Sequence, residues 1–439
     1  MAERGPVARP AYRLAAVSAA AVALLAGGLT GAGATEGRAA QPEGRYVIVL
    51  EDSARDRLDA IVREHGRNHG VRAGLRYRHA LVGYAAVMPE SQVAALRAAP
   101  GVRAVAPDRP VQATQQVLPT GVDRVQADVS STAAGNGTGA VDTAVAIIDT
   151  GIDDRHPDLN VAGGINCMDP SRPGAWRDNN GHGTHVAGTV AARDNGDDVV
   201  GVVPGARLYA VKVLGASGGG FTSTIVCGLD WLAQNAGPLG IKVANMSLGG
   251  DGADDGNCGF TDNDPEHQAM CRVVNGAGVT VVVAAGNETE DLANHTPAAF
   301  DEVLAVTATA DFNGQPGGGA AATCRTSNQD DTAANFSNFA VSTADAAHTM
   351  AGPGVCIRST RRSIGTTVYS GTSMASPHVA GAAALCLATG QCTDPSPTGV
   401  IARLRADAAA QPASYGFAGD PNAPVTGRYY GHLVHAGGY

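Results

Sequence analysis

Apolar runs alternate with helical patterns along most of the chain. Between residues 141 and 309, nearly continuous Val, Ile and Ala segments are separated by loops and by amphipathic or small-residue helices. Strands that are apolar on both sides are typical of a parallel sheet covered by helices on both faces. The pattern predicts strands at 141–149, 207–215, 242–250, 279–287 and 302–309, and helices at 183–192 and 223–236. The predicted fold class is α/β, with functional groups where strands end.

A shorter segment before this body has its own pattern. It predicts strands at 45–50, 83–89 and 102–108 and helices at 56–66 and 91–100. The order β-α-β-α-β favours a small ferredoxin-like α+β unit over residues 45–112. The polar segment 111–121 is a natural boundary, so the larger domain is expected to span 115–439.

The N-terminal residues 1–34 have a pattern that differs from both of these segments. Three arginines between residues 4 and 13 precede the apolar run 14–26, and the string A-G-A at 32–34 supplies small residues for cleavage. Residues 1–34 are therefore predicted to be a secretory signal peptide. The run is shorter than the roughly 20 residues that a spanning helix needs, so the mature form is expected outside the cell and off the membrane. An uncleaved anchor is the alternative.

Cysteine usage fits an exported chain. All eight cysteines lie beyond the leader, and an even number in an oxidising compartment indicates disulfides. The pairing stays open in principle, since eight cysteines allow 105 connectivities. Close spacing favours Cys258–Cys271, Cys324–Cys356 and Cys386–Cys392, which leaves Cys167 for Cys227. The absence of a C-x-x-C pair gives no support to a zinc ribbon or a thioredoxin-type site.

The net charge of −10 is unevenly distributed. Residues 45–112 carry 11 arginines and 7 acids, whereas residues 113–439 carry 16 basic and 31 acidic residues, or 16 − 31 = −15. Opposite charge favours association of the two segments. An acidic main body argues against nucleic acid as a partner, because phosphate binding needs basic stripes.

Three element ends carry reactive side chains. Asp149 ends the strand 141–149, His182 begins a helix of small residues, and Ser373 begins another. A hydroxyl, a base for its proton and a carboxylate that orients the base are the groups of nucleophilic acyl transfer. A serine at a helix N-terminus also lies beside unpaired N–H groups that favour an oxyanion. An ordinary N-cap serine is the alternative.

The strings around these residues resemble the subtilisin family of serine endopeptidases, the subtilases. The matching strings are Asp149-Thr150-Gly151, HGTHVAGT at 182–189 and GTSMASPHVAG at 371–381, in the chain order Asp, His, Ser. SLGG at 247–250 and AAGN at 284–287 match two further family segments. The resemblance extends from about residue 116 to the C-terminus and implies a subtilisin-like fold.

The resemblance implies a role for each matching residue. Ser373 would be the nucleophile, His182 the general base and then acid, and Asp149 the orienting carboxylate. The Asn287 amide and the Ser373 N–H would form the oxyanion hole, and catalysis would need no cofactor. The peptide would lie as an added strand between two edges, which implies broad specificity: Ser247, Leu248, Gly249 and Gly250, and Ala284, Ala285 and Gly286. Two buried connections are the alternative for these edges.

The resemblance also implies a structural calcium site. The side chains of Gln116, Asp158 and Asn195 stand at the matching positions. The carbonyls of Arg193, Asp197 and Val199 would complete an oxygen cage of the kind that calcium prefers. The loop is more charged than is usual in the family, so a solvated acidic loop is the alternative.

Residues 45–112 resemble the family propeptide, an intramolecular chaperone and transient inhibitor. Parallel sheets fold slowly because their contacts are non-local, which gives such a template a physical use. Cleavage is expected near Thr114 or Gln115, releasing a monomeric protease that acts on proteins and peptides.

Other interpretations are weaker. The serine string is close to the G-x-S-x-G elbow of esterases, with Asp407 or Asp420 and His432 as partners, but too few residues follow it for that fold. An aspartic protease needs a second Asp-Thr-Gly. His182 and His185 lack the H-E-x-x-H pattern of a metal pair. A secreted binding protein without activity remains open, because a sequence does not show geometry.

Overall fold

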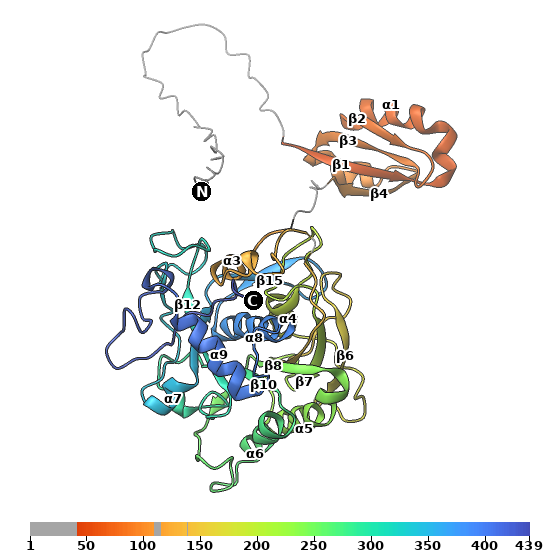
Figure 1. Cartoon of the computed structure of the whole chain (residues 1–439). Coiled ribbons are helices and arrows are strands. Elements are labelled where there is room, and N and C mark those ends of the chain that lie inside the picture. The colour runs from red at the N-terminus through yellow and green to blue at the C-terminus, as the bar shows by residue number, and fades with distance from the viewer. Residues whose placement is uncertain (1–41, 109–115, 138) are drawn as a thin grey trace, which may run out of the picture. The chain divides into compact units, whose positions relative to one another are not determined.

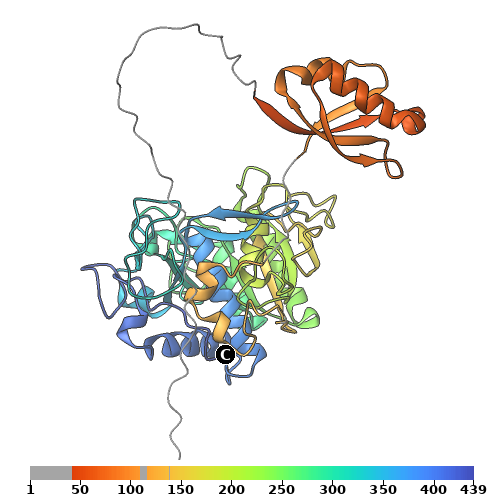
Figure 2. The same cartoon turned by 90° about the horizontal axis from the view of Figure 1, so that it is seen from above.

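The computed structural model describes residues 42–108, 116–137 and 139–439, so the predicted signal peptide and cleavage site lie outside the described residues. Contacts divide the chain into two compact units between Gln112 and Ala113, and each unit is a body of its own in both views (Figures 1 and 2). None of the helices in the described ranges is long and apolar enough to cross a membrane.

The small unit is a four-stranded antiparallel sheet with two helices, in the strand order β2-β3-β1-β4. Its core contains Ile48, Leu58, Tyr84, Met88 and Leu96. The elements are β1 (Glu43–Leu50), α1 (Leu58–His69), β2 (Arg72–Tyr77), β3 (Gly83–Pro89), α2 (Val93–Arg97) and β4 (Val102–Pro107). The ferredoxin-like prediction is confirmed, but β2 was missed. Its residues are mostly exposed, so it lacks an apolar pattern and is defined by its pairing with β3.

An eight-stranded sheet organises the large unit. Its order is β13-β12-β10-β8-β5-β7-β6, with β14 also paired to β12, and all neighbours are parallel except β12 and β13. The strands are β5 (Ala144–Asp149), β6 (Val161–Asn166), β7 (Arg207–Lys212), β8 (Ile241–Met246), β10 (Thr280–Ala284), β12 (Leu304–Ala310), β13 (Thr332–Ala333) and β14 (Thr349–Pro353). The five strands expected from apolar runs are present. Glycine and proline in β6 and β14 hid those two strands from the pattern.

Helices cover both faces of this sheet, and α8 lies at the centre of the unit beside α4 (Figure 1). α4 and α8 belong to one apolar core, and α5 and α6 contribute to the other. The helices are α3 (Thr120–Arg124), α4 (His182–Ala191), α5 (Thr222–Leu239), α6 (Pro265–Cys271), α7 (Thr343–Ala347), α8 (Thr372–Ala388) and α9 (Pro397–Ala409). α8 is buried over most of its length, and a Cβ on Gly381 would lie 2.6 Å from Val202. Its small residues therefore permit the close packing.

Short strand pairs and four disulfides complete the unit. β9 (Gly250–Asp251) pairs with β11 (His295–Thr296), and β15 (Ile357–Thr360) pairs with β16 (Thr366–Tyr369). All four predicted disulfides are confirmed: Cys167–Cys227, Cys258–Cys271, Cys324–Cys356 and Cys386–Cys392.

Candidate active site

An aspartate and a histidine meet where β5 ends and α4 begins. Asp149 is the last residue of β5 and is fully buried, and His182 is the first residue of α4. The His182 Nδ1 atom lies 2.9 Å from both carboxylate oxygens. Burial has the largest single effect and would lower the pKa of His182, but the charge and hydrogen bond of Asp149 together with the charge of Asp178 raise this pKa above its ordinary value.

Two glycines allow this approach. A Cβ on Gly183 would lie 2.2 Å from the Gly151 carbonyl oxygen and 3.1 Å from Asp149. Gly151 itself has φ of +100°, and a Cβ there would lie 2.2 Å from the Trp176 carbonyl oxygen. Since real side chains do not tolerate such contacts, glycine at both positions is needed to bring His182 against Asp149.

A buried carboxylate that sequence reasoning missed holds the two elements in register. Asp178 accepts hydrogen bonds from the Thr150 hydroxyl (2.9 Å) and from the Gly181 and Thr184 N–H groups (2.9 and 3.0 Å). Buried Lys212 donates to the Thr150 carbonyl and, at 2.8 Å, to the Leu214 carbonyl. Asp178 and Lys212 therefore fix the turn after Asp149. The only sequence signal was the rarity of lysine, which by itself indicates no role.

Ser373 occupies the first turn of α8 above a buried polar network. Its hydroxyl donates to the Ser247 carbonyl at 3.2 Å, and its own carbonyl accepts from the Ser247 hydroxyl at 2.7 Å. The Ser247 hydroxyl also lies 2.9 Å from that of Ser376, which donates to Asn245 at 2.9 Å. The end of β8 thereby positions the start of α8.

The Asn287 side chain is oriented by the residue before Ser373. Its Oδ1 atom accepts from the Thr372 N–H at 2.9 Å and from the Thr372 hydroxyl at 3.2 Å. The oxygen is thus turned toward Thr372, so the amino group faces away from it. Asn287, His182 and Ser373 line one cavity of about 260 Å³.

A larger cavity of about 550 Å³ begins at the same residues. It is lined by His182 and Ser373 together with the whole predicted edge Ser247–Gly250. Ala284, Ala285 and Gly286 line neither cavity. The Ala285 N–H donates to Val306, and the Gly286 carbonyl accepts from Asn338. For these three residues the structure favours a buried connection over a substrate edge.

The comparisons with known proteins agree with this geometry. The model of the "Subtilase family" of peptidases matches residues 141–403, and that of "Peptidase inhibitor I9" matches residues 45–114. This chain belongs to the subtilase family. A crystal structure of "a cold adapted subtilisin-like serine proteinase" is similar to it, with a TM-score of 0.51 and 28% identity, covering 72% of this chain and 97% of the other.

Two relatives have sequences similar to that of this subtilase. "Subtilisin Savinase" of Lederbergia lenta is 40% identical over 274 residues, which are 62% of this chain and 84% of that protein. "Alkaline protease" of Alkalihalobacillus alcalophilus is 39% identical over 297 residues, which are 67% of this chain and 66% of the relative. The match thus spans just under two thirds of the latter.

The predicted calcium ligands of this subtilase come together from three segments. Asp158 is buried, and its carboxylate accepts from the Asn195 amide at 3.0 Å and from the Val199 N–H at 3.4 Å. The Gln116 amide donates to the carbonyls of Arg193 (3.2 Å) and Val199 (3.5 Å). Burial raises the pKa of Asp158 to about 7.

The donor set fits a hard cation. The Gln116 and Asn195 oxygens accept from the Gly196 and Asp197 N–H groups at 2.8 and 2.9 Å, so both amides would have to turn by about 180° and give up these hydrogen bonds to present oxygen beside the carboxylate and two carbonyls. Asp197, the remaining predicted ligand, is exposed and adjoins Asn195 through this contact.

The other histidine of the motif is structural. His185 is fully buried, its Nε2 atom lies 3.0 Å from the Ile357 carbonyl oxygen, and burial lowers its pKa to about 3. It contributes to packing against β15 and not to a metal pair with His182.

Proposed function

We propose that this subtilase is a secreted serine endopeptidase that hydrolyses peptide bonds through an acyl-enzyme. One observation carries the proposal: His182 contacts Asp149 through Nδ1 and lines both cavities that Ser373 lines, one of them shared with Asn287. A base that is oriented on one side and faces a hydroxyl on the other is the arrangement that acyl transfer requires.

The proton path begins at Ser373. With Nδ1–H held by Asp149, the neutral His182 ring presents an unprotonated Nε2. Rotation about the Cα–Cβ bond of Ser373 turns its hydroxyl from the Ser247 carbonyl toward this nitrogen, and catalytic hydrogen bonds often tighten only when substrate binds. Nε2 takes the proton as the Ser373 oxygen attacks the peptide carbonyl carbon.

The charge then develops on the substrate oxygen. The Asn287 amino group and the Ser373 N–H at the start of α8 would donate to this oxyanion. When the intermediate collapses, the C–N bond breaks and the leaving amine takes the proton from His182. The serine ester is hydrolysed by a water that repeats the same steps, which restores the hydroxyl.

The substrate would be an extended peptide beside residues Ser247–Gly250. Gly250 is exposed in the two-stranded β9-β11 pair at the mouth of the larger cavity. Binding through backbone groups tolerates many side chains at most positions, which supports broad specificity.

The small unit would be a propeptide that is removed after export. Its match to the peptidase inhibitor I9 family and the predicted signal peptide support this maturation. The calcium ion would be held by Asp158, Gln116 and Asn195 with the carbonyls of Arg193, Asp197 and Val199. It would cross-link the start of the large unit to two loops of the sheet and take no part in catalysis.

Ser373→Ala tests the activity directly. The matured protein should hydrolyse casein and not a triglyceride, and a fluorophosphonate should label Ser373. The variant should lose both hydrolysis and labelling. A correctly processed wild type that is neither labelled nor active would instead support a binding protein.

A further inference from the structure

A buried carboxyl group in this structure has no structural partner. Glu266 lies in the first turn of α6 and is 7% exposed. Within the described ranges its Oε1 atom has no hydrogen-bond partner. Burial, and then the charge of Asp264, raise the pKa of Glu266 to about 7. An unpaired buried carboxyl group costs folding free energy, so its position calls for an explanation.

Glu266 lines the 550 Å³ cavity that contains Ser373 and His182. Leucine, isoleucine and phenylalanine side chains and a run of glycines make up much of the wall. Asp251 is the other acid, and the described lining includes no arginine or lysine. The cavity that begins at the reactive serine is therefore acidic, with a wall that is partly apolar.

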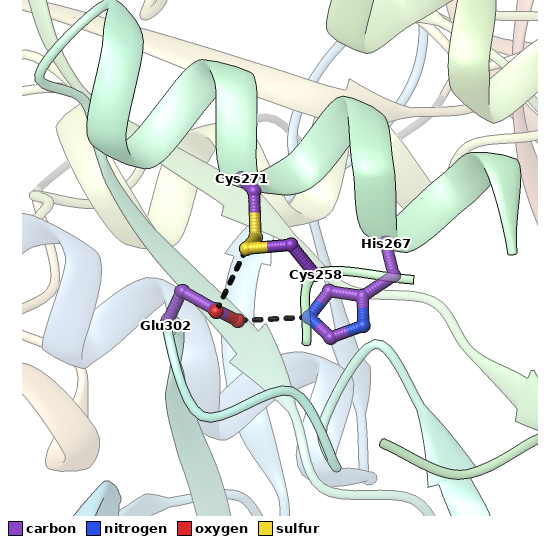
Figure 3. A group of neighbouring side chains, drawn as sticks. All are labelled: Cys258, His267, Cys271 and Glu302. Carbon is purple, nitrogen blue, oxygen red and sulfur yellow. Dashed lines mark hydrogen bonds and ion pairs between the residues drawn. A yellow bond between two sulfur atoms is a disulfide. The ribbon is translucent and has the colours of Figure 1, made fainter. Parts of the chain in front are cut away.

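The neighbouring residues keep the first turn of α6 in place (Figure 3). His267 lies 2.9 Å from Glu302 through Nε2 and stacks on the Phe300 ring at 4.0 Å, while the Cys258–Cys271 disulfide ties the preceding loop to the helix. The two sulfurs are joined to each other, so the four side chains of Figure 3 (Cys258, His267, Cys271 and Glu302) form a structural anchor and not a thiolate metal site. Consecutive helical residues point about 100° apart, so this anchor leaves Glu266 to the cavity.

We propose that Glu266 is a specificity residue that selects peptides carrying an arginine or lysine at the position that enters this cavity. The inference rests on the proposed peptidase function. A basic side chain has an apolar stem that matches the Leu214, Ile225 and Leu248 walls and a cationic end that donates to the unpaired carboxylate oxygen. An apolar side chain of similar length, such as norleucine, would leave this oxygen unpaired.

The test uses matched peptides that differ at one position at a time. Arginine, lysine, norleucine or glutamine is placed at each position beside one scissile bond, and kcat/KM is measured for each peptide at pH 9. One position should show a preference for arginine over norleucine of about tenfold or more. The ratio cancels the shared pH dependence of His182, and it should fall below pH 7 as Glu266 becomes neutral.

Glu266→Gln should abolish the preference while retaining hydrolysis of the norleucine peptide. Asp251→Asn removes the same charge from an exposed position of the same cavity and should keep the preference. The pairing of Glu266 with a basic side chain would be refuted if wild type and Glu266→Gln had the same arginine-to-norleucine ratio of kcat/KM. It would also be refuted if Glu266→Gln and Asp251→Asn lost this preference equally.

A binding assay distinguishes failure of this inference from failure of the proposed peptidase function. If wild type cleaves no peptide, the peptidase function fails, but fluorescence anisotropy still compares the dissociation constants of the arginine and norleucine peptides, using Ser373→Ala protein from which an added protease has removed residues 45–112. Tighter arginine binding that depends on Glu266 supports the pocket, and equal binding overturns it. Glu266→Gln should unfold at the same temperature as wild type or higher at pH 9, because it removes a buried charge.

Discussion

The orientation of a single amide decides whether the cavity can stabilise an anion. Thr372 takes the Asn287 oxygen through two hydrogen bonds, so the amino group is the part of the side chain left for the cavity. An asparagine after glycine is a common turn residue, and its sequence position could not show this orientation. The contact with Thr372 also makes the donor rigid before substrate arrives.

Asn287→Ala should lower kcat with little change in KM. The donor matters only when charge develops on the substrate oxygen, so its loss raises the barrier and leaves ground-state binding intact. The expected reduction is about 10² to 10³-fold, the range known for removing such a donor from subtilisin itself. Steady-state kinetics measure it, and Thr372→Ser, which keeps the orienting hydroxyl, is the control.

The pH profile depends on Asp149. Its carboxylate, with a smaller contribution from Asp178, raises the pKa of His182 against the effect of burial, so kcat/KM should increase with pH as the imidazolium loses its proton above the ordinary histidine range. Asp149→Asn removes this charge and should move the midpoint to lower pH. It should also reduce kcat about 10⁴-fold because the histidine tautomer is no longer fixed. An unchanged midpoint in the variant would contradict this origin of the pKa shift.

At the scale of elements, the site depends on how closely α4 approaches β5. Gly183 lies at the contact, and a methyl group there meets backbone at 2.2 Å. The sequence string HGTHVAGT marks the helix, but only the packing shows why its second residue has no side chain.

Gly183→Ala should lose activity and stability together. The helix must shift away from Asp149, at a cost of about 1 to 3 kcal/mol in unfolding free energy and with a large loss in kcat. The control is Gly237→Ala in α5, where an added Cβ meets nothing within 4 Å. Its unfolding free energy should change by no more than about 1 kcal/mol. Denaturant unfolding and casein hydrolysis measure both effects.

The stability that the loops around Asp158 give to the fold should depend on calcium. The folded pKa of Asp158 is about 7, above the unfolded value of about 3.9, so without metal the protonated form favours folding. This contribution is present at low pH and is lost as pH rises through 7. A bound calcium ion reverses the effect because it pairs with the charged form.

Calcium should therefore raise the unfolding free energy at pH 9 by about 2.7 kcal/mol when its free concentration is 100 times Kd. Asp158→Asn should not be stabilised by calcium. In EDTA it should also not lose unfolding free energy as pH rises through 7. The control Asp142→Asn changes an exposed carboxylate that pairs with Arg207 at 3.4 Å, and it should behave as wild type. Thermal unfolding with and without EDTA measures the difference.

At the scale of the whole molecule, the two units imply a precursor. If the cut is made by the protease itself, Ser373→Ala should accumulate with residues 45–112 still attached. Wild type should begin between about residues 110 and 120, as read by N-terminal sequencing. A wild-type start near residue 41 would exclude processing, and a processed Ser373→Ala protein would indicate another protease.

Local patterns predicted much of this molecule. Continuous apolar runs identified the five central strands because those strands are buried on both faces. β2 and β14 escaped because exposed residues interrupt the pattern of β2, and glycine and proline interrupt that of the buried strand β14. The motifs identified Asp149, His182 and Ser373. Asp178 lies outside the predicted elements and Lys212 interrupts an apolar strand, and both act only through contacts that folding creates.

The sequence by itself determined the fold class and the three reactive residues, because periodicity and motif strings are local properties of the chain. It favoured the cysteine pairs by spacing, and the structure decided them. Tertiary structure decided which way the Asn287 amide turns, that Ala284–Gly286 are enclosed, and that Glu266 faces the cavity without a partner. These depend on residues distant in the chain, and the free energy of a buried polar group is set by the atoms that surround it.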